Sequence, residues 1–384
     1  MMNVAIWVGV YLEGARGISL FQGYLARHLA RLDSRNRYRL FGYFFRDFER
    51  KKALISVPAQ SNFTLDIHRW PESVVHPLVY HWDLPIFAPS LRAAGVTLFH
   101  STGICAPRLD GIKTIATVHD FMPILFPEWG GDRTTLRNYR RWLLRADRLM
   151  VVSRHTLKDM LDLFDVPEEK AVVIPPGVDT DIFKPKEPQA EADTLRRRYR
   201  LPRRYLLSVG PYDLRRNFKI LIRVLQELIG TPEGRDLGLV IAGARSGNYE
   251  EVAGLARAAR LQDRVCFAGY VPMEDLVRLY QEAEVLVYPS LYEGFGQPPM
   301  EALACGTPVV SSNASALPEN LEGCAALVGP RDAPALVGAV LELLRNPGLR
   351  QARREAGLKR AAEMSWMRTT QRVHALYEEL HARP

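Results

Sequence analysis

The chain has 384 residues, of which 47% are hydrophobic and 24% charged, so it can bury large cores and is not disordered. At roughly 100–200 residues per domain, this length predicts about two domains. The formal net charge of +8 favours anionic partners, such as nucleic acid, phosphorylated ligands or an anionic membrane face, without choosing among them.

The cysteines and the apolar segments narrow the class of protein. The four cysteines have no CxxC spacing and no histidine cluster beside them, which argues against a zinc site and indicates a reducing compartment. The opening stretch MMNVAIWVGVYLEG is too short to span a bilayer, and no other window reaches ~18 uncharged apolar residues. We therefore expect a cytoplasmic protein, with peripheral contact to the cytoplasmic face of the membrane as a further expectation.

Short β-branched runs recur along the chain, and their lack of clean alternation is typical of strands buried on both faces of a parallel sheet. Helical patterns lie between many of them, because apolar residues repeat at spacings of three and four within 18–32 and 221–228. This alternation predicts an α/β fold. The expected strands are 4–10, 96–99, 114–118, 149–152, 172–174, 205–209, 239–242, 265–267, 285–288 and 308–311.

Residues 184–204 interrupt the alternation of strands and helices, since their sequence KPKEPQAEADTLRRRYRLPRR is rich in proline and charged residues. We interpret this segment as a linker, with a short helix in EADTLRRRYR. It separates one Rossmann-like domain, residues 1–183, from a second, residues 205–364. A last amphipathic helix in 365–384 is expected to pack back toward the first domain. The predicted fold is two doubly wound domains facing across a cleft, with ligands at the carboxyl ends of the strands.

The stretch YPSLYEGFGQPPMEALACGTPVV, residues 288–310, holds Glu293 and Glu301 with seven residues between them. Two prolines should open a helix near residue 299, which would place Glu301 in its first turn. There Glu301 either complements the helix dipole or binds a ligand, and Glu293 is either an exposed loop acid or a ligand contact. The EGFG glycines leave backbone N–H groups accessible, and each carboxylate can accept hydrogen bonds from a sugar diol.

A second motif, SVGPYDLRRNFKIL, supplies positive charge. A predicted strand ends at Gly210, and Arg215 and Arg216 follow in the loop before a helix. Arginine suits bidentate contact with phosphate, whereas a solvated basic loop is the alternative. The position at a strand's carboxyl end, in the same domain as the two acids, favours phosphate binding.

Together these motifs resemble the nucleotide-sugar domain of the retaining glycosyltransferases of family 4, which have the GT-B fold. The family's E-x7-E motif matches EGFGQPPME, and its glycine–loop–Arg-Lys motif matches GPYDLRRN, with Arg216 where the family usually has lysine. The surroundings VIPPGVD, VIAG, RVCFAGYV, PSLYEGFG, MEALACGTPVVSS, SALPE and a late SW also match. The resemblance is strong over residues 150–330 and weaker upstream.

The resemblance implies a role for each motif residue. Glu293 would contact hydroxyls of the donor sugar, Glu301 would hold the nucleotide ribose, and the two arginines would bind the diphosphate. The first domain would bind the acceptor and the second the nucleotide sugar. The implied donor contacts are Gly17, Gly210, Arg215, Arg216, Glu293, Gly294, Phe295, Gly296 and Glu301.

Upstream matches are looser. EGARGISLF supplies Gly14 and Gly17 where the family has a glycine-rich loop near the donor phosphate, although a plain tight turn is the alternative. His119, in TIATVHDFMPILFPEW, resembles the histidine that lies near the reacting sugar in mannosyltransferase-like members; a structural histidine is the alternative. Asp120 either orients that imidazole or caps a turn, and His100 also ends a strand.

These resemblances imply a retaining hexosyltransferase of cell-surface polysaccharide or glycoconjugate synthesis. GDP-mannose is the favoured donor, a UDP-sugar is possible, and the acceptor would be a glycan or a lipid-linked saccharide. No cofactor or metal is expected, and the DTD at 179–181 is interpreted as a turn. The alternatives are a sugar-nucleotide epimerase, a glycoside phosphorylase, or a non-catalytic nucleotide or nucleic-acid binder. The arginines form no stripe with aromatic residues, so we do not expect nucleic acid as a partner.

Three basic stretches lie in the first half, at 26–39, 45–52 and 134–148. The last places Leu136, Tyr139, Leu143 and Leu144 beside arginines. Such a segment either faces an anionic membrane or lipid diphosphate acceptor, or is a helix with an apolar core side and a solvated basic face. The sequence leaves both interpretations open.

Overall fold

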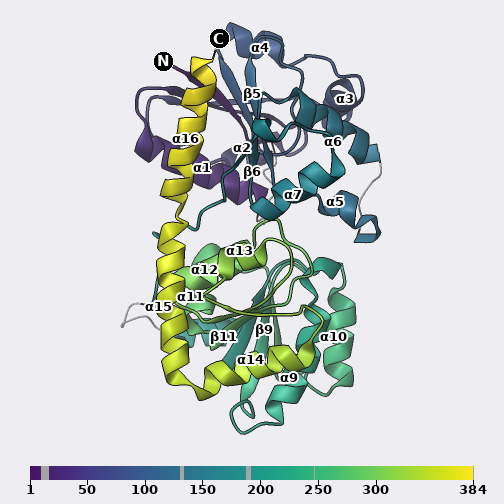
Figure 1. Cartoon of the computed structure of the whole chain (residues 1–384), viewed down its shortest axis with the longest axis vertical. Coiled ribbons are helices and arrows are strands. Elements are labelled where there is room, and N and C mark those ends of the chain that lie inside the picture. The colour runs from purple at the N-terminus through teal and green to yellow at the C-terminus, as the bar shows by residue number, and fades with distance from the viewer. Residues whose placement is uncertain (10–16, 130–133, 187–191, 246, 384) are drawn as a thin grey trace. The chain divides into compact units, whose positions relative to one another are not determined.

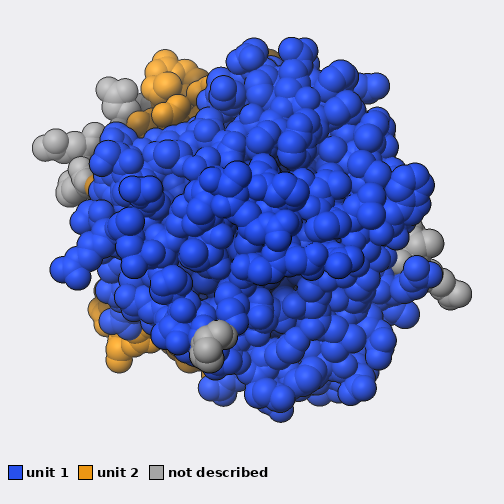
Figure 2. Space-filling model, turned by 90° about the horizontal axis from the view of Figure 1, so that it is seen from above, with its two compact units in different colours: residues 1–177, 366–384 blue, residues 178–365 orange. Residues whose placement is uncertain are grey.

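The computed structural model describes residues 1–9, 17–129, 134–186, 192–245 and 247–383 (Figure 1). They form two compact units, coloured separately in Figure 2: unit 1 comprises residues 1–177 and 366–384, and unit 2 comprises 178–365. The division falls at Gly177–Val178, ahead of the segment 184–204 that the sequence marks as a linker. That segment belongs to unit 2 because its helix, α8 (Ala192–Tyr199), is tied to Asp275 by Arg198 and the Tyr199 hydroxyl.

Unit 1 is built on a seven-stranded sheet in the order β3-β2-β1-β4-β5-β6-β7, and every paired neighbour is parallel. Each run predicted within this unit overlaps a strand, with ends shifted by up to three residues, and residue 10, the predicted end of the first run, lies outside the described residues. The strands β2 and β3 were not predicted. The strands are β1 (Asn3–Trp7), β2 (Arg37–Tyr43), β3 (Phe63–His68), β4 (Leu98–Ser101), β5 (Lys113–Val118), β6 (Arg148–Val151) and β7 (Ala171–Val173).

Helices cover this sheet, and the pattern of α1 is the one that its periodicity predicts. Leu25 and Leu29 are completely buried, and the two ends fall at Ile18 and Leu32. Helix α1 thus buries one apolar stripe in unit 1. The helices of unit 1 are α1 (Ile18–Leu32), α2 (Phe48–Ala53), α3 (Glu72–His76), α4 (Ala88–Ala93), α5 (Met122–Leu125), α6 (Thr134–Arg145), α7 (Arg154–Leu163) and α16 (Trp366–Ala382).

The last helix, α16, lies alongside α1 and completes unit 1 (Figure 1). The ring of Trp366 contacts Phe21 edge-on, with 5.2 Å between ring centres. Further along the helix, the buried Tyr377 hydroxyl lies 2.6 Å from Nδ1 of His100. Residues nearly three hundred positions apart in sequence therefore share one core.

Helix α6 shows how the residues of the basic stretch 134–148 are arranged in unit 1. Leu143 and Trp142 are buried in the core of unit 1, and Tyr139 and Leu144 pack against the same cluster. Arg145 pairs with Asp83 across the surface of the unit. The stretch 134–148 is therefore a core-packed helix with a basic outer side, the second of the two interpretations that the sequence allows.

Unit 2 has a six-stranded sheet in the order β10-β9-β8-β11-β12-β13, again with parallel pairing throughout. Five of these strands were predicted and β13 was not. The strands are β8 (Arg204–Val209), β9 (Leu237–Ala242), β10 (Val265–Gly269), β11 (Val285–Tyr288), β12 (Val309–Ser312) and β13 (Ala326–Val328).

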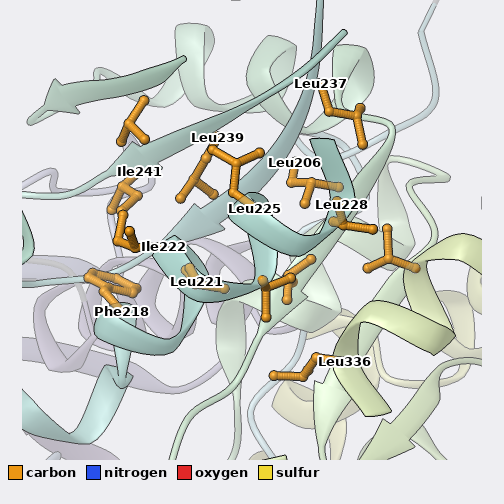
Figure 3. Packing of buried hydrophobic residues seen from close by; sticks show 14 of the residues in the cluster. Leu206, Phe218, Leu221, Ile222, Leu225, Leu228, Leu237, Leu239, Ile241 and Leu336 are labelled. Atoms are coloured by element: carbon orange, nitrogen blue, oxygen red, sulfur yellow. The ribbon is translucent and has the colours of Figure 1, made fainter. Parts of the chain in front are cut away.

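The core of unit 2 forms where α9 (Phe218–Ile229) packs against the sheet. Figure 3 shows Leu221, Leu225 and Leu228 of this helix among Leu206, Leu239 and Ile241 of β8 and β9. Burying such side chains is worth about 1.5–3 kcal/mol each. The remaining helices of unit 2 are α10 (Tyr249–Ala258), α11 (Met273–Glu282), α12 (Gln297–Ala304), α13 (Leu317–Leu321), α14 (Ala333–Arg345) and α15 (Pro347–Glu363).

Both units are thus doubly wound α/β structures, as predicted. In each sheet the order reverses beside the first strand of the unit, and ligands of such sheets bind at the carboxyl ends near this point. In unit 2 these strands are β8 and β11, whose following loops carry the two motifs singled out in the sequence. Among the described residues, none of the helices is long and apolar enough to cross a bilayer.

Candidate active site

The loop after β8 is held in a fixed shape by its own polar residues. The Asp213 side chain accepts a hydrogen bond from the Arg216 backbone N–H at 2.9 Å, which closes a short 3₁₀ turn. Asn217 follows in the left-handed conformation, with φ of 55°, and its amide donates to the carbonyls of Pro289 and Pro330. The basic loop is therefore tied to the loop after β11, and the two motifs meet.

Arg216 and Glu293 form a buried ion pair where these loops meet. Their side chains are respectively 10% and 6% exposed, and Nη1 of Arg216 donates to Oε1 of Glu293. The same oxygen accepts from the Tyr288 hydroxyl at 2.9 Å and from the Ser290 hydroxyl at 2.6 Å. Oε2 faces Nη1 of Arg215 at the longer distance of 3.8 Å. Oε1 is therefore the anchored atom of this carboxylate.

The charge state of Glu293 follows from two opposing effects. Burial alone raises the pKa of a carboxyl group, because it penalises the charged form. The nearby charges of Arg216 and Arg215 and the hydrogen bond from Ser290 outweigh this, so the pKa of Glu293 lies below its ordinary value of 4.5. Glu293 is thus a carboxylate at neutral pH and not a proton donor.

Gly210 makes room for the arginine. Its φ of +147° lies in a region that L side chains rarely adopt, and a Cβ there would lie 2.7 Å from Nε of Arg216. Among the described residues, that Nε atom is buried without a hydrogen-bond partner. The guanidinium also lies over the Tyr288 ring, with Cζ 5.2 Å from the ring centre. The glycine, the ring and the carboxylate together fix the orientation of Arg216.

The loop 293–296 is held at both ends by residues that the motif does not include. The Glu293 backbone N–H donates to the Ser315 hydroxyl at 2.7 Å, and Nδ2 of the buried Asn320 donates to the Phe295 carbonyl at 2.6 Å. Gly294, Phe295 and Gly296 are themselves buried. Their backbone is thus fixed from α13, the short helix that carries Asn320.

Helix α12 begins earlier than predicted. Gly296 adopts the left-handed conformation, with φ of 94°, and the helix runs from Gln297 to Ala304 rather than from residue 299 to 305. Glu301 consequently lies in the second turn, so the prediction of a first-turn position was wrong. The macrodipole acts mainly within the first turn, so it does not account for this acid. Glu301 is buried, and its Oε2 accepts from the Tyr280 hydroxyl at 2.8 Å.

The start of α12 is poor in hydrogen-bond donors. A helix N-terminus usually binds anions through its first free N–H groups. Here Pro298 and Pro299 occupy two of those positions and have no N–H. An anion at this end of the sheet would therefore depend on arginine side chains more than on the helix.

In unit 1, His119 follows β5 and is held by a neighbouring strand end. Its Nε2 donates to the Thr102 carbonyl at 2.8 Å, since a carbonyl can only accept. Thr102 is fixed in turn, because its hydroxyl donates to the Trp7 carbonyl and accepts from the Gln22 amide at 2.7 Å. Burial lowers the pKa of His119 despite the hydrogen bond to Thr102 and the charge of Asp120. The imidazole is thus neutral at neutral pH, with Nδ1 as its acceptor atom.

Of the other residues that the sequence singled out in this half, two have structural roles in unit 1. Asp120 caps a turn, accepting from the Met122 backbone N–H at 3.1 Å. His100 is completely buried between Tyr377 and Thr117, and burial lowers its pKa to about 3, so it is a structural histidine. Gly17 immediately precedes α1 with φ of 87°, a conformation that favours glycine. Gly14 lies outside the described residues.

Asp179 and Asp181 behave as the sequence predicts. The Asp179 side chain accepts from the Asp181 backbone N–H at 3.1 Å, and its carbonyl accepts from Phe183 at 2.8 Å. This is turn chemistry. Among the residues that the structure describes, no group of three or more His, Cys, Asp or Glu side chains is arranged to hold a metal ion.

Comparison with known proteins identifies the family. The model for glycosyl transferases group 1 matches residues 192–360, and that for glycosyltransferase family 4 matches residues 16–182. The chain is 33% identical to the MMP alpha-(1->4)-mannosyltransferase of Mycolicibacterium hassiacum over 300 residues, which are 73% of this chain and 69% of that protein. The chain belongs to glycosyltransferase family 4. It is a hexosyltransferase by the same comparisons, which sets aside the alternative of a non-catalytic binder.

Further relatives of this family 4 glycosyltransferase agree. It is 29% identical to the O-antigen chain mannosyltransferase B of Escherichia coli over 308 residues, 79% of this chain and 78% of that one. Among solved structures, sucrose-phosphate synthase from Thermosynechococcus elongatus matches with a TM-score of 0.80 at 21% identity, over the whole of both chains. Anabaena HepE, solved in complex with UDP and glucose, matches with a TM-score of 0.77 at 17% identity, covering 98% of this chain and 100% of that one. These structures show the GT-B fold.

The structure of this glycosyltransferase brings together Gly210, Arg215, Arg216 and Glu293, and it adds side chains that sequence reasoning missed. Ser290 and Tyr288 carry a weak signal, since both lie at the end of a predicted strand directly before the acid. Ser315 lies in SALPE, which matches the family without indicating this contact, and Asn320 carries no signal, because nothing in SALPEN indicates that its amide holds a carbonyl twenty-five residues upstream. The roles of Gly17, His119 and Glu301 toward a donor stay predictions.

Proposed function

We propose that this glycosyltransferase moves a hexose, with mannose favoured, from a nucleotide diphosphate sugar to a glycan or lipid-linked saccharide, with retention at the anomeric carbon. The observation that carries the proposal is the buried pair of Arg216 and Glu293 at the carboxyl ends of β8 and β11. Mannosyltransferase relatives support the sugar, and HepE, which binds UDP and glucose, supports a nucleotide sugar as donor.

The two oxygens of Glu293 suit different tasks. Oε1 takes hydrogen bonds from Arg216, Tyr288 and Ser290, which orient the carboxylate. Oε2 has a more distant neighbour in Arg215, so it is the oxygen that we assign to hydroxyls of the donor sugar. A hydrogen bond to a charged acceptor contributes about 1.5–3 kcal/mol. The orientation would be set before the donor arrives.

The arginines would bind the diphosphate and stabilise it as it leaves. Arg216 commits Nη1 to Glu293, while its Nε–H is buried without a hydrogen-bond partner among the described residues, and we assign this donor to a phosphate oxygen. Charge develops on the diphosphate as the glycosidic bond breaks, so fixed cations there lower the barrier. Pro298 and Pro299 leave α12 few amides for this task, and the side chains would therefore supply most of the stabilisation.

Retention without a side-chain nucleophile would follow a route on one face of the sugar. The bond from the anomeric carbon to the diphosphate oxygen breaks as the acceptor oxygen approaches from the same side, and the departing phosphate takes the acceptor proton. His119, neutral and holding its proton on Nε2, would accept a hydrogen bond from a sugar hydroxyl at Nδ1. Glu301, in the second turn of α12, would bind the ribose hydroxyls through its carboxylate.

Donor identity can be tested by thermal shift. GDP-mannose, UDP-glucose, UDP-N-acetylglucosamine and ADP-glucose are compared on the wild type, on Glu301→Gln and on Glu227→Gln, a control with an exposed carboxylate. A true donor raises the melting temperature because it binds only the folded state. We expect the largest rise with GDP-mannose, a much smaller one in Glu301→Gln, and no change in the control. Equal shifts for all four donors, or an unaffected Glu301→Gln, would contradict the assignment.

The stereochemistry needs a separate measurement. The first-formed product is followed by NMR, and we expect the anomeric configuration of the donor to be preserved. An inverted product would remove the retaining mechanism but leave the donor assignment intact. Turnover that requires inorganic phosphate, or interconversion of the donor without acceptor, would instead indicate a phosphorylase or an epimerase.

A further inference from the structure

The carboxyl ends of β2 and β3 in unit 1 carry a surface of aromatic and basic side chains. We call it the basic–aromatic surface, and it consists of Phe45, Phe48, Lys51, Lys52 and Arg69. Phe45 is 47% exposed, although phenylalanine is ordinarily buried. Cζ of Arg69 lies 5.9 Å from the ring centres of both Phe45 and Phe48. One cation therefore bridges two rings of the segment that follows β2.

The same arrangement recurs with the lysines. Nζ of Lys52 lies 5.7 Å from the centre of the Phe48 ring, and Nζ of Lys51 lies 5.5 Å from that of Phe44. Cations at this distance are attracted by the faces of aromatic rings. Lys52 thus holds its positive charge beside the partly exposed Phe48 ring, whereas the Phe44 ring beside Lys51 is buried.

Helix α2 has no part in the core that would explain its apolar residues. None of the residues in Phe48–Ala53 is buried, and Leu54, directly after the helix, is 39% exposed. A helix of one and a half turns is marginal by itself, and a solvated one would ordinarily be polar on its outer side. Phe45 and Leu54 are large apolar residues that the fold of unit 1 leaves exposed, which indicates contact with something outside the unit.

The other two basic stretches are used differently. In 134–148, Leu143 is buried, and Arg145 pairs with Asp83. In 26–39, Leu29 is buried in α1, and Arg39 of β2 pairs with Asp66 of β3 at 3.1 Å. Those two stretches thus place apolar residues in the core of unit 1, whereas none of the residues in 45–52 is buried.

We propose that the basic–aromatic surface docks on an anionic lipid bilayer. Phe45 and Phe48 would enter the boundary between headgroups and acyl chains, where aromatic rings concentrate, and Lys51, Lys52 and Arg69 would lie against lipid phosphates. The formal net charge of +8 favours the same partner. The proposal does not depend on the donor, because none of its residues is among those that we assign to donor binding.

The acids near this surface limit the affinity. Asp47 and Glu49 lie in the same segment, and Glu72 is 3.7 Å from Lys51. Five cations at 46, 50, 51, 52 and 69 face three acids, so binding would be reversible and sensitive to salt. Each basic residue near an anionic membrane strengthens binding by about fivefold, a factor that falls as salt screens it.

Cosedimentation of the full chain with vesicles tests the proposal. Vesicles of phosphatidylglycerol and phosphatidylcholine are compared with pure phosphatidylcholine, at low and raised salt. We expect binding to the anionic vesicles, weakened roughly 10- to 30-fold by Lys52→Gln with Arg69→Gln, because two charges are removed. The matched control, Lys158→Gln with Arg223→Gln, removes two exposed charges elsewhere and should bind as the wild type does.

A second measurement asks which segment meets the lipid. The wild-type chain has tryptophans of its own, so the emission of Phe45→Trp is measured as a difference from the wild type. This difference signal should shift to the blue when anionic vesicles are added, and brominated lipid should quench it. Leu136→Trp, at a position 44% exposed on α6, should show neither change. Phe45→Ser should lower vesicle binding at both salt concentrations, because the contribution of its ring is apolar.

Three outcomes would overturn the proposal. The first is no binding to anionic vesicles at low salt. The second is equal binding by the double variant and its matched control, with melting temperatures that show both to be folded. The third is retention on a soluble acidic polysaccharide that depends on Phe45, without any vesicle binding, which would assign the surface to an acidic glycan instead.

Discussion

Arg216 and Glu293 are seventy-seven residues apart and form a buried ion pair between the loops that follow β8 and β11. Each of the two residues is exposed by less than a tenth. A buried charge is stable only when it is paired and hydrogen-bonded, and here Tyr288 and Ser290 complete the set. The pair therefore links the local stability of unit 2 to the site that we assign to the donor.

Replacing Glu293 should test this link through the pH dependence of stability. Because the folded pKa of Glu293 lies below its ordinary value of 4.5, its contribution is complete above pH 4.5 and is lost as the pH falls through the folded value. Glu293→Gln leaves Arg216 buried without its partner and should cost about 3–5 kcal/mol near neutral pH. We expect the difference in urea unfolding free energy to shrink on acidification.

The control for this prediction is Glu227→Gln, which removes an exposed pair with Arg223. Such pairs contribute about 0.3–0.5 kcal/mol, so this variant should stay close to the wild type throughout. A Glu293→Gln variant as stable as the wild type at neutral pH would show that the pair does not stabilise unit 2.

A methyl group at Gly210 should disturb the site without unfolding the chain. The added Cβ would meet Nε of Arg216 at 2.7 Å and Cδ at 3.0 Å, so the flexible arginine must move. Losing one hydrogen bond to a charged group costs about 1.5–3 kcal/mol, and kcat/KM should fall roughly 10- to 100-fold in Gly210→Ala. Gly338→Ala, where a Cβ meets open space on α14, is the control and should keep full activity. Wild-type kcat/KM in Gly210→Ala would separate Arg216 from the reaction.

Asn320 is a positioning residue, and its effect should appear in the KM of the donor. Asn320→Leu leaves the Phe295 carbonyl without its donor at 2.6 Å, and an unsatisfied buried carbonyl costs about 1–3 kcal/mol. We expect a higher KM with a smaller change in kcat, because loop 293–296 would lose its fixed shape. Asn320→Asp has the same size and no amide donor, so it should behave in the same way.

A purely structural role for Asn320 predicts a different result. Asn346→Leu removes the cap of α15, where the side chain accepts from Leu349 at 2.9 Å, and it should lower the melting temperature alone. If the Asn320 variants change only the melting temperature, as this control does, then Asn320 does not position the loop.

His119→Phe keeps an aromatic ring and removes both nitrogens. The pKa of His119 is lowered from 6.5 by burial, so a neutral ring stabilises the fold above pH 6.5, and this contribution is lost as the pH falls through the folded value. We expect the wild type to lose stability relative to His119→Phe on acidification, as measured by urea unfolding. We also expect kcat to fall roughly 10-fold or more, the loss of one hydrogen bond to the sugar. Unchanged kcat would make His119 structural, like His100.

The fold was largely predictable where the burial of apolar side chains alone determines the local structure. The helix at 18–32 and most of the strands follow from apolar periodicity, because burial decides those residues. Strand β2 was missed because Arg37 and Arg39 make its sequence look solvated. In the structure Tyr38 and Leu40 are buried, and Arg39 is neutralised by Asp66 on β3, a partner twenty-seven residues away. No local pattern carries that information.

In the candidate site, the positions of the charged residues were predictable from the sequence, but their contacts were not. Glu293 and the two arginines were found because motif spacing places them at strand ends. That Arg216 pairs with Glu293, and that Asn320 holds the Phe295 carbonyl, depends on how β8, β11 and α13 come together in three dimensions. The start of α12 was misplaced by two residues because the prediction took the paired prolines as the first helical residues. In the structure the left-handed Gly296 ends the loop, and the helix already begins at Gln297.

Unit 1 is assembled from two stretches separated by the whole of unit 2, and this determines the order of events on the ribosome. Trp366 and Tyr377 fill its core, and His374 lies 3.0 Å from Asp33, yet these residues are translated after unit 2. The nascent first stretch must wait, with the site for α16 uncovered, until all of unit 2 has been synthesised. In vivo, the first half of the sequence would therefore reach its native state only after unit 2 has been synthesised, and the interval before α16 arrives is when this half would most need a chaperone.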